Sequence, residues 1–194
     1  ALELAARCVE VAAANGLGFW AAWGTIERGC ALVLLGRLDE GLATMLRGRE
    51  EYPGIGVSEE ANLMARLADA RLRLGRLEEA EAALSAGFVA AARLTTDVWC
   101  AELHRLRGVL AARRGAGAQA WAAHFDRAEE AARRHGASAL ELRAACSRYE
   151  AALATGGEAS RGDARERLAA VYASFTQGRD TADVRLAAEL LARG

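Results

Sequence analysis

The sequence predicts an all-α protein, an α-α superhelix of about ten antiparallel helices, and three observations predict it. The phrase "LLGRLDE" at residues 34–40 returns as "RLGRLEE" at residues 73–79, so that Gly75 takes the place of Gly36 in the second copy. Ala-rich stretches without alternating β-branched residues separate these phrases, and Pro53 is the only proline. A period of about 40 residues with two helices per unit is typical of helical repeat arrays.

Two weaker copies of the phrase extend the repeat. "AARRGAG" places Gly115 one period after Gly75, and "ALATGGE" places Gly156 one further period along the chain. An apolar helical segment runs into each glycine and an Ala-rich one follows it. We expect Gly36 and Gly75 to take the left-handed turn between paired helices, whereas the fourth copy is degenerate at its turn, with extra residues around "GGEASRGD". Asp163 follows a glycine and is expected to cap the ninth helix. The expected helices cover residues 1–15, 18–35, 38–52, 58–74, 77–93, 96–114, 117–135, 139–155, 163–176 and 181–193.

These helices define one expected domain over residues 1–194. Its repeats span residues 18–53, 58–93, 96–135 and 139–176. Residues 1–15 read as the second helix of a truncated preceding repeat, so we expect the chain to be part of a longer protein. Because the ends of a solenoid need a cover, we expect this open N-terminal end to self-associate and residues 181–194 to form a C-terminal capping helix.

Composition excludes several classes of function. The net charge of −1 and the pI near 6.4 do not favour a nucleic acid or an anionic membrane as partner. All 25 basic residues are arginine, which removes Schiff-base chemistry and the lysine of a phosphate-binding loop. The four cysteines are far apart and no apolar run reaches the roughly 18 residues of a membrane span. We therefore expect reduced thiols and a cytoplasmic protein.

The residues around each turn resemble the tetratricopeptide repeat. In the first repeat, Gly29 takes the small eighth position and Gly41 the small twentieth, while Met45 takes the large twenty-fourth and Pro53 the closing proline. Corresponding positions in the next two repeats hold Ala68, Ala80, Leu84, Gly108, Phe125 and Ala128. Trp121 falls where a small residue is expected, so the packing there must differ.

A closer resemblance covers almost the whole chain. Its segments are "GFWAAWGTIERGCALVLLGR", "AELHRLRGVLAARRG", "HGASALELRAACS" and "VYASFTQGRDTADVRLAAELL". They resemble, in the same order, the tetratricopeptide-like C-terminal region of large bacterial signalling proteins. In those proteins, a class III adenylate or guanylate cyclase domain or a DNA-binding domain precedes an AAA-type or STAND-type ATPase module. The cyclase metal ligands and the ATP loop have no counterpart here, so the resemblance implies a regulatory region without either activity.

The resemblance also implies a binding groove. In tetratricopeptide arrays, the first helix of each pair lines the concave face through its second, fifth, ninth and twelfth positions. The groove candidates are Trp23, Ile26, Asn62, Asp69, Glu102, Arg105, Glu141 and Arg148. Such a surface suits a peptide or helix that carries both apolar and charged anchors. The alternative for Glu102 and Arg105 is an ordinary ion pair on a solvated helix.

Aromatic residues gather at the start of the first repeat. Phe19, Trp20 and Trp23 lie within five residues, and Trp20 and Trp23 are one helical turn apart. They form either a binding platform or a core anchor between the first two repeats, and large aromatic side chains are more often buried.

No catalytic, cofactor or metal site emerges. His104, His124 and His135 lack ligand spacing, and "GAGAQA" follows a helix rather than the strand that a dinucleotide fingerprint needs. The predicted function is a non-enzymatic regulatory domain of a signalling protein, which binds a protein or peptide, or another part of its own parent chain, through the groove. The alternative is a sensor of a small-molecule inducer, which a deep cavity lined by Trp23, Asp69, Glu102 and Arg105 would favour.

Overall fold

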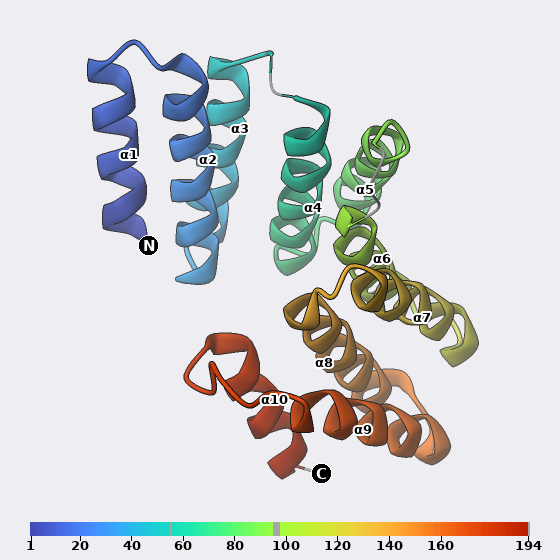
Figure 1. Ribbon diagram of the computed structural model, residues 1–194. Coiled ribbons are helices and arrows are strands. Elements are labelled where there is room, and N and C mark those ends of the chain that lie inside the picture. The colour runs from blue at the N-terminus through green and yellow to red at the C-terminus, as the bar shows by residue number, and fades with distance from the viewer. Residues whose placement is uncertain (55, 95–97, 194) are drawn as a thin grey trace. The chain divides into compact units, whose positions relative to one another are not determined.

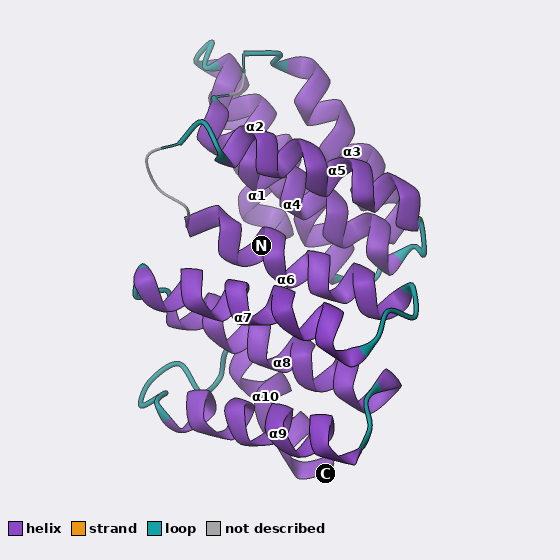
Figure 2. Cartoon of the chain, turned by 90° about the vertical axis from the view of Figure 1, so that its right-hand side faces the viewer, coloured by secondary structure: helices purple, strands orange, loops and turns teal. Residues whose placement is uncertain are grey.

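The protein is all-helical, as the sequence predicts. The computed structural model describes residues 1–54, 56–94 and 98–193, and within these residues it contains ten helices and no strand (Figures 1 and 2). The helices are α1 (Leu2–Ala14), α2 (Gly18–Leu34), α3 (Leu38–Glu51), α4 (Val57–Arg73), α5 (Leu77–Ala91), α6 (Val98–Arg113), α7 (Ala118–Arg134), α8 (Ser138–Thr155), α9 (Glu158–Ala173) and α10 (Ala182–Arg193).

The chain divides into two compact units, which are described separately. Unit 1 is Ala1–Leu94 and unit 2 is Thr95–Gly194, so the division falls between the second and third expected repeats. In unit 1, each helix from α1 to α5 packs on the next. In unit 2, α6 to α10 pack in the same consecutive manner, and α8 also contacts α6 and α10. Consecutive packing of antiparallel helices is the arrangement expected of a helical repeat.

The repeated phrase forms the turn within a helix pair. Gly36 has φ 81° and Gly75 has φ 74°, and the third copy, Gly115, has φ 75°. These are left-handed conformations that glycine adopts without steric cost, so the prediction for Gly36 and Gly75 is confirmed, and Gly115 turns in the same way. Gly156, in the fourth copy of the phrase, differs from these glycines and has an extended conformation (φ −85°, ψ 151°).

Glycine also sets the spacing of α2 and α3 in unit 1. A Cβ added to Gly41 would lie 2.7 Å from the carbonyl oxygen of Gly29, and one added to Gly48 would lie 2.8 Å from that of Ala22. The two backbones are therefore in direct contact along this seam, at the eighth and twentieth positions where small residues are expected. Met45 lies beside it and is fully buried.

Unit 2 closes around large side chains instead. Trp121 and Phe125 of α7 are buried with their ring centroids 6.0 Å apart, and Tyr149 of α8 belongs to the same cluster. A Cβ on Gly108 of α6 would lie 2.8 Å from the ring of Phe125. The packing at Trp121 therefore differs from the glycine contact of α2 and α3, as expected, because large side chains fill the core. Leu168 of α9 and Leu190 of α10 complete this core.

The ninth helix begins earlier than expected. It starts at Glu158 with Gly157 as its N-cap, so Gly162 and Asp163 lie inside the helix and Asp163 does not cap it. Gly162 is tolerated there because it is exposed and nothing lies within 4 Å of an added Cβ. The expected start of the ninth helix at residue 163, with Asp163 as its cap, is therefore wrong.

Candidate functional site

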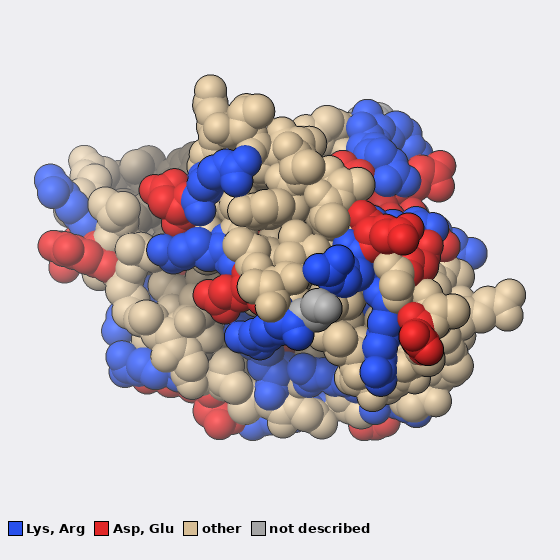
Figure 3. Space-filling view, turned by 90° about the horizontal axis from the view of Figure 1, so that it is seen from below, with Lys and Arg blue, Asp and Glu red and all other residues tan. Residues whose placement is uncertain are grey.

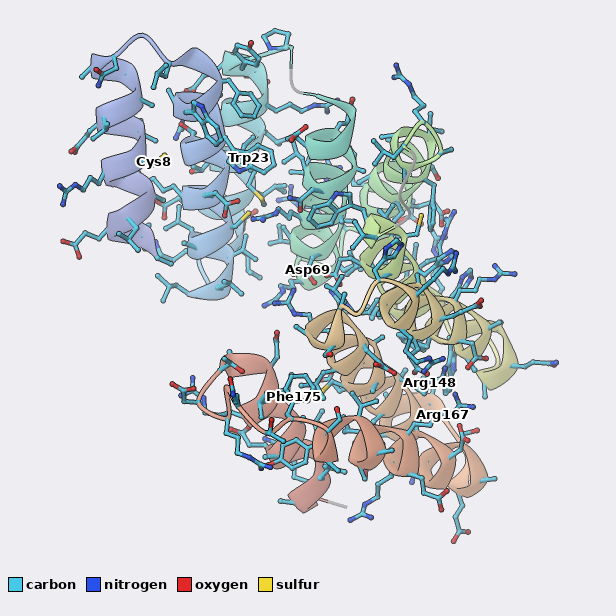
Figure 4. The ribbon with its side chains drawn as sticks, viewed as in Figure 1. Cys8, Trp23, Asp69, Arg148, Arg167 and Phe175 are labelled. Atoms are coloured by element: carbon cyan, nitrogen blue, oxygen red, sulfur yellow. The ribbon has the colours of Figure 1, made fainter. Side chains whose placement is uncertain are left out.

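The candidate surface of unit 1 lies on α2 and α4, each of which is the first helix of its helix pair. Three of the predicted groove residues lie there, and all three are partly exposed: Trp23 on α2, and Asn62 and Asp69 on α4. Figure 4 labels Trp23 and Asp69. The neighbours of Trp23 and Asn62 at i+4 and i+7 share their face of the helix. We call the resulting set the α2–α4 strip, which consists of Trp23, Glu27, Cys30, Asn62, Arg66 and Asp69.

Arg66 ties the two helices of the strip together. Its Nε donates to Asn62 Oδ1 on α4 at 2.9 Å. Its Nη1 donates to Glu27 Oε2 at 3.0 Å and to Cys30 Sγ at 3.0 Å, both on α2. Glu27 and Arg66 are not among the groove residues expected from the sequence, although one signal in the sequence points to them. They stand one repeat apart in the sequence and carry opposite charges.

Ile26 is not a groove residue, and the prediction for it is wrong. Its exposed fraction is 0%, and that of Ala65, the corresponding residue of the second repeat, is 2%. The close approach of α3 explains this burial, because a Cβ on Gly48 would lie 2.9 Å from Ile26 Cγ1. The exposed face of the first helix is therefore rotated by one residue, and Glu27 and Arg66 occupy the place expected for Ile26 and Ala65.

Cys30 gives the strip no nucleophile. Burial raises the pKa of its thiol above the ordinary value, and the nearby Arg66 guanidinium opposes that rise without cancelling it. The thiol is therefore protonated at neutral pH, whereas nucleophilic cysteines are thiolates. Its sulfur also lies 3.5 Å from Met45 Sδ, so Cys30 joins the strip to the core beneath it.

The aromatic residues border the strip at the start of α2. Phe19 stacks on Trp23 with ring centroids 6.3 Å apart and meets Tyr52, just after α3, edge-on at 5.7 Å. A core anchor between the first two repeats would require contacts from one repeat to the next. The contacts of Phe19 instead lie within one helix pair, α2 and α3. Phe19, Trp23 and Tyr52 are partly buried, while Trp20 is 54% exposed. The cluster is thus partly core and partly surface.

The predicted residues of α6 and α8 in unit 2 form polar contacts with other side chains, and those of α6 are shielded from solvent. Arg105 donates to both carboxylate oxygens of Glu102, at 2.9 and 2.7 Å, and to Ser147 Oγ on α8 at 3.0 Å. The Glu102 and Arg105 side chains are only 16% and 13% exposed, so they are not the solvated pair of the alternative interpretation. Glu141 accepts a hydrogen bond from Arg133 at 3.0 Å.

Arg148 is buried, and its assignment to an open groove is wrong. Its side chain is 3% exposed because α8 is packed on by α6, α7, α9 and α10. Its Nε donates to Glu129 Oε1 at 2.9 Å, and its Nη2 donates to Asp126 Oδ1 at 2.6 Å. Arg167 of α9 reaches the same two acids at 3.4 and 3.3 Å (Figure 4). The result is an ion network that joins α7, α8 and α9.

A small hollow adjoins this network. Its volume is about 160 Å³, and α7, α8 and α9 all contribute to its walls. The residues that line it are Ala118, Gln119, Trp121, Ala122, Arg148, Ser160, Asp163 and Ala164. Trp121 contributes an aromatic wall, and its buried Nε1 has no hydrogen-bond partner in the described part of the chain. None of the residues expected to line a sensor cavity lies here.

Neither charge pattern nor histidine geometry indicates catalysis. His104 and His124 stack with ring centroids 6.1 Å apart, and burial, followed by the charges of His124, Arg127 and Arg107, lowers the pKa of His104 to about 4. Over residues 1–54, 56–94 and 98–193, no three potential metal ligands come together. Basic and acidic side chains both appear on the face in Figure 3.

Comparison with known proteins adds no family. No protein-family model, no curated protein and no solved structure matches the chain. Among the described helices, none combines the length and the apolar character needed to span a bilayer.

Proposed function

We propose that the chain is a non-enzymatic partner-binding domain of a bacterial signalling protein, and that the α2–α4 strip contacts the partner. One observation carries the proposal. The first helices of the first two repeats, α2 and α4, lie next to each other. Their residues at equivalent positions of the repeat form a single partly exposed face. Binding through this face would regulate a cyclase, an ATPase or a transcriptional module of the parent chain, and it requires unequal affinity for two states of that protein.

The chemistry of the strip defines the partner class. Trp23 and the adjoining aromatic cluster supply an apolar anchor, while Glu27 and Arg66 are 39% and 31% exposed and present both signs of charge. Asp69 is held by Arg73 at 2.8 Å and adds an acidic end. This combination suits an amphipathic peptide or helix with one large apolar residue and a basic neighbour.

Peptide selection on the intact chain tests the proposal. Peptides selected from a displayed library should bind at least tenfold more weakly to Trp23→Ala and to the double variant Glu27→Arg/Arg66→Glu, which reverses the charges but keeps the pair. The matched control is Arg37→Glu/Glu40→Arg, an exposed pair outside the strip that should leave binding unchanged. Peptides that bind all variants equally would refute the proposal, as would a failure to select any binder.

A second candidate function is the sensing of a small molecule, and the hollow of unit 2 is the observation that favours it. A ligand that binds only the folded state raises its stability. A library of small metabolites should therefore contain a compound that raises the melting temperature and protects α7 and α9 from hydrogen exchange. Stabilisation by compounds that protect only unit 1 would count against this candidate.

Self-association remains a prediction for the N-terminal end. Leu4 and Val11 of α1 lie two helical turns apart on one face and are both exposed. Exposed apolar residues grouped in this way favour association. Sedimentation of the wild type and of Leu4→Glu/Val11→Glu over a range of concentrations tests it, and identical monomeric masses would exclude it.

A further inference from the structure

The hollow between α7, α8 and α9 is lined by polar groups that lack partners. Two nitrogens of the buried Arg148 guanidinium are engaged by Glu129 and Asp126, but Nη1 donates to no residue in the described ranges. The side-chain amide of Gln119 and the hydroxyl of Ser160 likewise make no hydrogen bond to described residues. The Arg148 side chain is only 3% exposed, so a guanidinium nitrogen that donates to no described residue at the wall of a hollow points to a ligand.

Further donors surround the hollow. Gln119 lies in the first turn of α7 and Ser160 in the first turn of α9. Neither helix has a side-chain cap, and the first N–H groups of a helix have no partner within it. The buried Trp121 Nε1 adds a donor that no described residue accepts from. The walls of the hollow are therefore rich in donors, and a ligand must present at least one hydrogen-bond acceptor.

The local charge excludes an anion as the best occupant. Arg148 and Arg167 face three carboxylates, those of Asp126, Glu129 and Asp163, so the surroundings carry one net negative charge. A cation fits no better, because it would approach the Arg148 guanidinium. The Asp163 carboxylate is only partly engaged by Arg167, so it can accept one further hydrogen bond. The ligand should thus be neutral, with one acceptor and one donor.

Size and shape narrow the ligand further. A volume of about 160 Å³ corresponds to about five water molecules, each of roughly 30 Å³. The indole of Trp121 and three alanines supply apolar walls, which suit a flat group with a short hydrocarbon stem.

We propose that this hollow binds a primary carboxamide, an inference that rests on the second candidate function and names its ligand class. The carbonyl oxygen accepts from Arg148 Nη1, and the amide nitrogen donates to the Asp163 carboxylate. Gln119 and Ser160 close the mouth and make further hydrogen bonds. The carboxamide belongs either to a free small molecule or to an asparagine or glutamine side chain of a bound protein.

The test compares three probes of nearly equal size on the full chain. Propionamide, propionate and ethylammonium are titrated while the indole signal of Trp121 and the backbone amides of residues 118–122 are followed by NMR. Propionamide should give saturable shifts in the millimolar range, at least fivefold tighter than either charged probe. The proposal is overturned if a charged probe binds more tightly, or if no probe gives a saturable shift at this site up to about 100 mM.

Two matched pairs of variants locate the binding. Gln119→Ala should weaken propionamide at least threefold, while Gln177→Ala, an exposed glutamine outside the hollow, should not change it. Ala122→Leu fills the hollow and should abolish binding, while Ala123→Leu places the same side chain on the exposed face of α7. Equal effects within each pair would overturn the proposal.

The same assay separates the two sources of the carboxamide. A blocked glutamine dipeptide that binds at least tenfold more tightly than propionamide identifies a protein side chain, and equal or weaker binding identifies a free small amide. If all probes fail at the hollow but a metabolite binds elsewhere in unit 2, the carboxamide inference fails while the sensing function stands.

Discussion

Unit 1 and unit 2 use the same helical repeat but hold their helices together in different ways. In unit 1, the Arg66–Glu27 contact lies on a partly exposed surface, above a seam where Gly29 and Gly41 bring two backbones together. In unit 2, the Arg148–Glu129 pair is almost completely buried beside the aromatic core. The difference shows that a repeat can place an ion pair either where a partner can reach it or where only the fold can use it.

The largest expected effect comes from removing the buried arginine. Arg148→Met leaves the buried Glu129 with only the longer contact to Arg167, at 3.4 Å, so unit 2 should lose about 3–5 kcal/mol of stability. The matched change in unit 1, Arg66→Met, should cost no more than about 1 kcal/mol because its pair is solvated. Hydrogen exchange measured in both units gives the two values separately.

A rescue variant sharpens this contrast. Arg148→Met/Glu129→Leu removes both charges and should recover most of the lost stability, since an apolar pair of similar volume replaces the ion pair. If the double variant were as unstable as the single one, or if Arg66→Met cost as much as Arg148→Met, the distinction between the two pairs would fail.

The glycine seam should respond next most strongly. Gly41→Ala places a Cβ 2.7 Å from the carbonyl oxygen of Gly29 and 2.9 Å from the Val33 nitrogen, so we expect unit 1 to lose about 1–3 kcal/mol. The control in unit 2 is Gly162→Ala, on the open face of α9, which should stabilise by about 0.5–1 kcal/mol because alanine favours a helix. Urea denaturation followed by circular dichroism measures the change in the free energy of unfolding for both variants. Changes of the same sign would contradict the close backbone contact between α2 and α3.

Acid should weaken unit 2 through a histidine that unit 1 lacks. The pKa of His104 is about 4 in the folded protein, against 6.5 for an ordinary histidine, because burial and nearby positive charges disfavour its protonated form. Between these pH values the unfolded chain binds more protons, so stability falls as the pH drops from about 6.5 to about 4. After allowance for solvent screening, the loss is about 1–2 kcal/mol.

Substitution isolates the contribution of His104. His104→Gln should flatten the pH dependence of unit 2 over this window, while His135→Gln, at the exposed end of α7, serves as the control. The free energy of unfolding, measured in pH steps, gives the slope. An unchanged slope in His104→Gln would show that its titration is not coupled to folding.

The smallest effects are expected from exposed ion pairs between helices, which both units contain. Asp39–Arg76 joins neighbouring helix pairs of unit 1 at 2.6 Å, and Arg143–Asp183 joins α8 to α10 of unit 2 at 2.7 Å. All four side chains are at least about a third exposed, so neutralising either pair should cost less than about 1 kcal/mol and the cost should shrink in salt. Thermal unfolding of Arg76→Ala and Asp183→Asn at two salt concentrations would reveal any larger role.

The sequence predicted the helices well because their signals are local. Apolar periodicity and the glycine turns place most helix ends within one or two residues. The start of α9 was missed because "GGEASRGD" contains three glycines, and only the packing shows that Gly162 is compatible with a helix. A local pattern cannot tell a glycine that turns the chain from one that is merely exposed.

The site was predicted less completely because it depends on tertiary packing. Trp23, Asn62 and Asp69 lie on the strip, but Ile26 and Arg148 are buried by contacts with other helices. A rotation of one residue in the exposed face moves a charged residue into the place expected for an apolar one. The pairing of Arg148 with Glu129 on the preceding helix has no periodic signal in the sequence.

The backbone contact between α2 and α3 also has a mechanical consequence. Each helix fits the other through glycines at three levels, Gly29, Gly41 and Gly48, so sliding one along the other would drive side chains into the opposite main chain. Under a pulling force the pair should behave as one stiff bar. The chain would then extend at the contacts of this pair with α1 and α4. Tension would therefore change the distance between α2 and α4, the two helices of the strip.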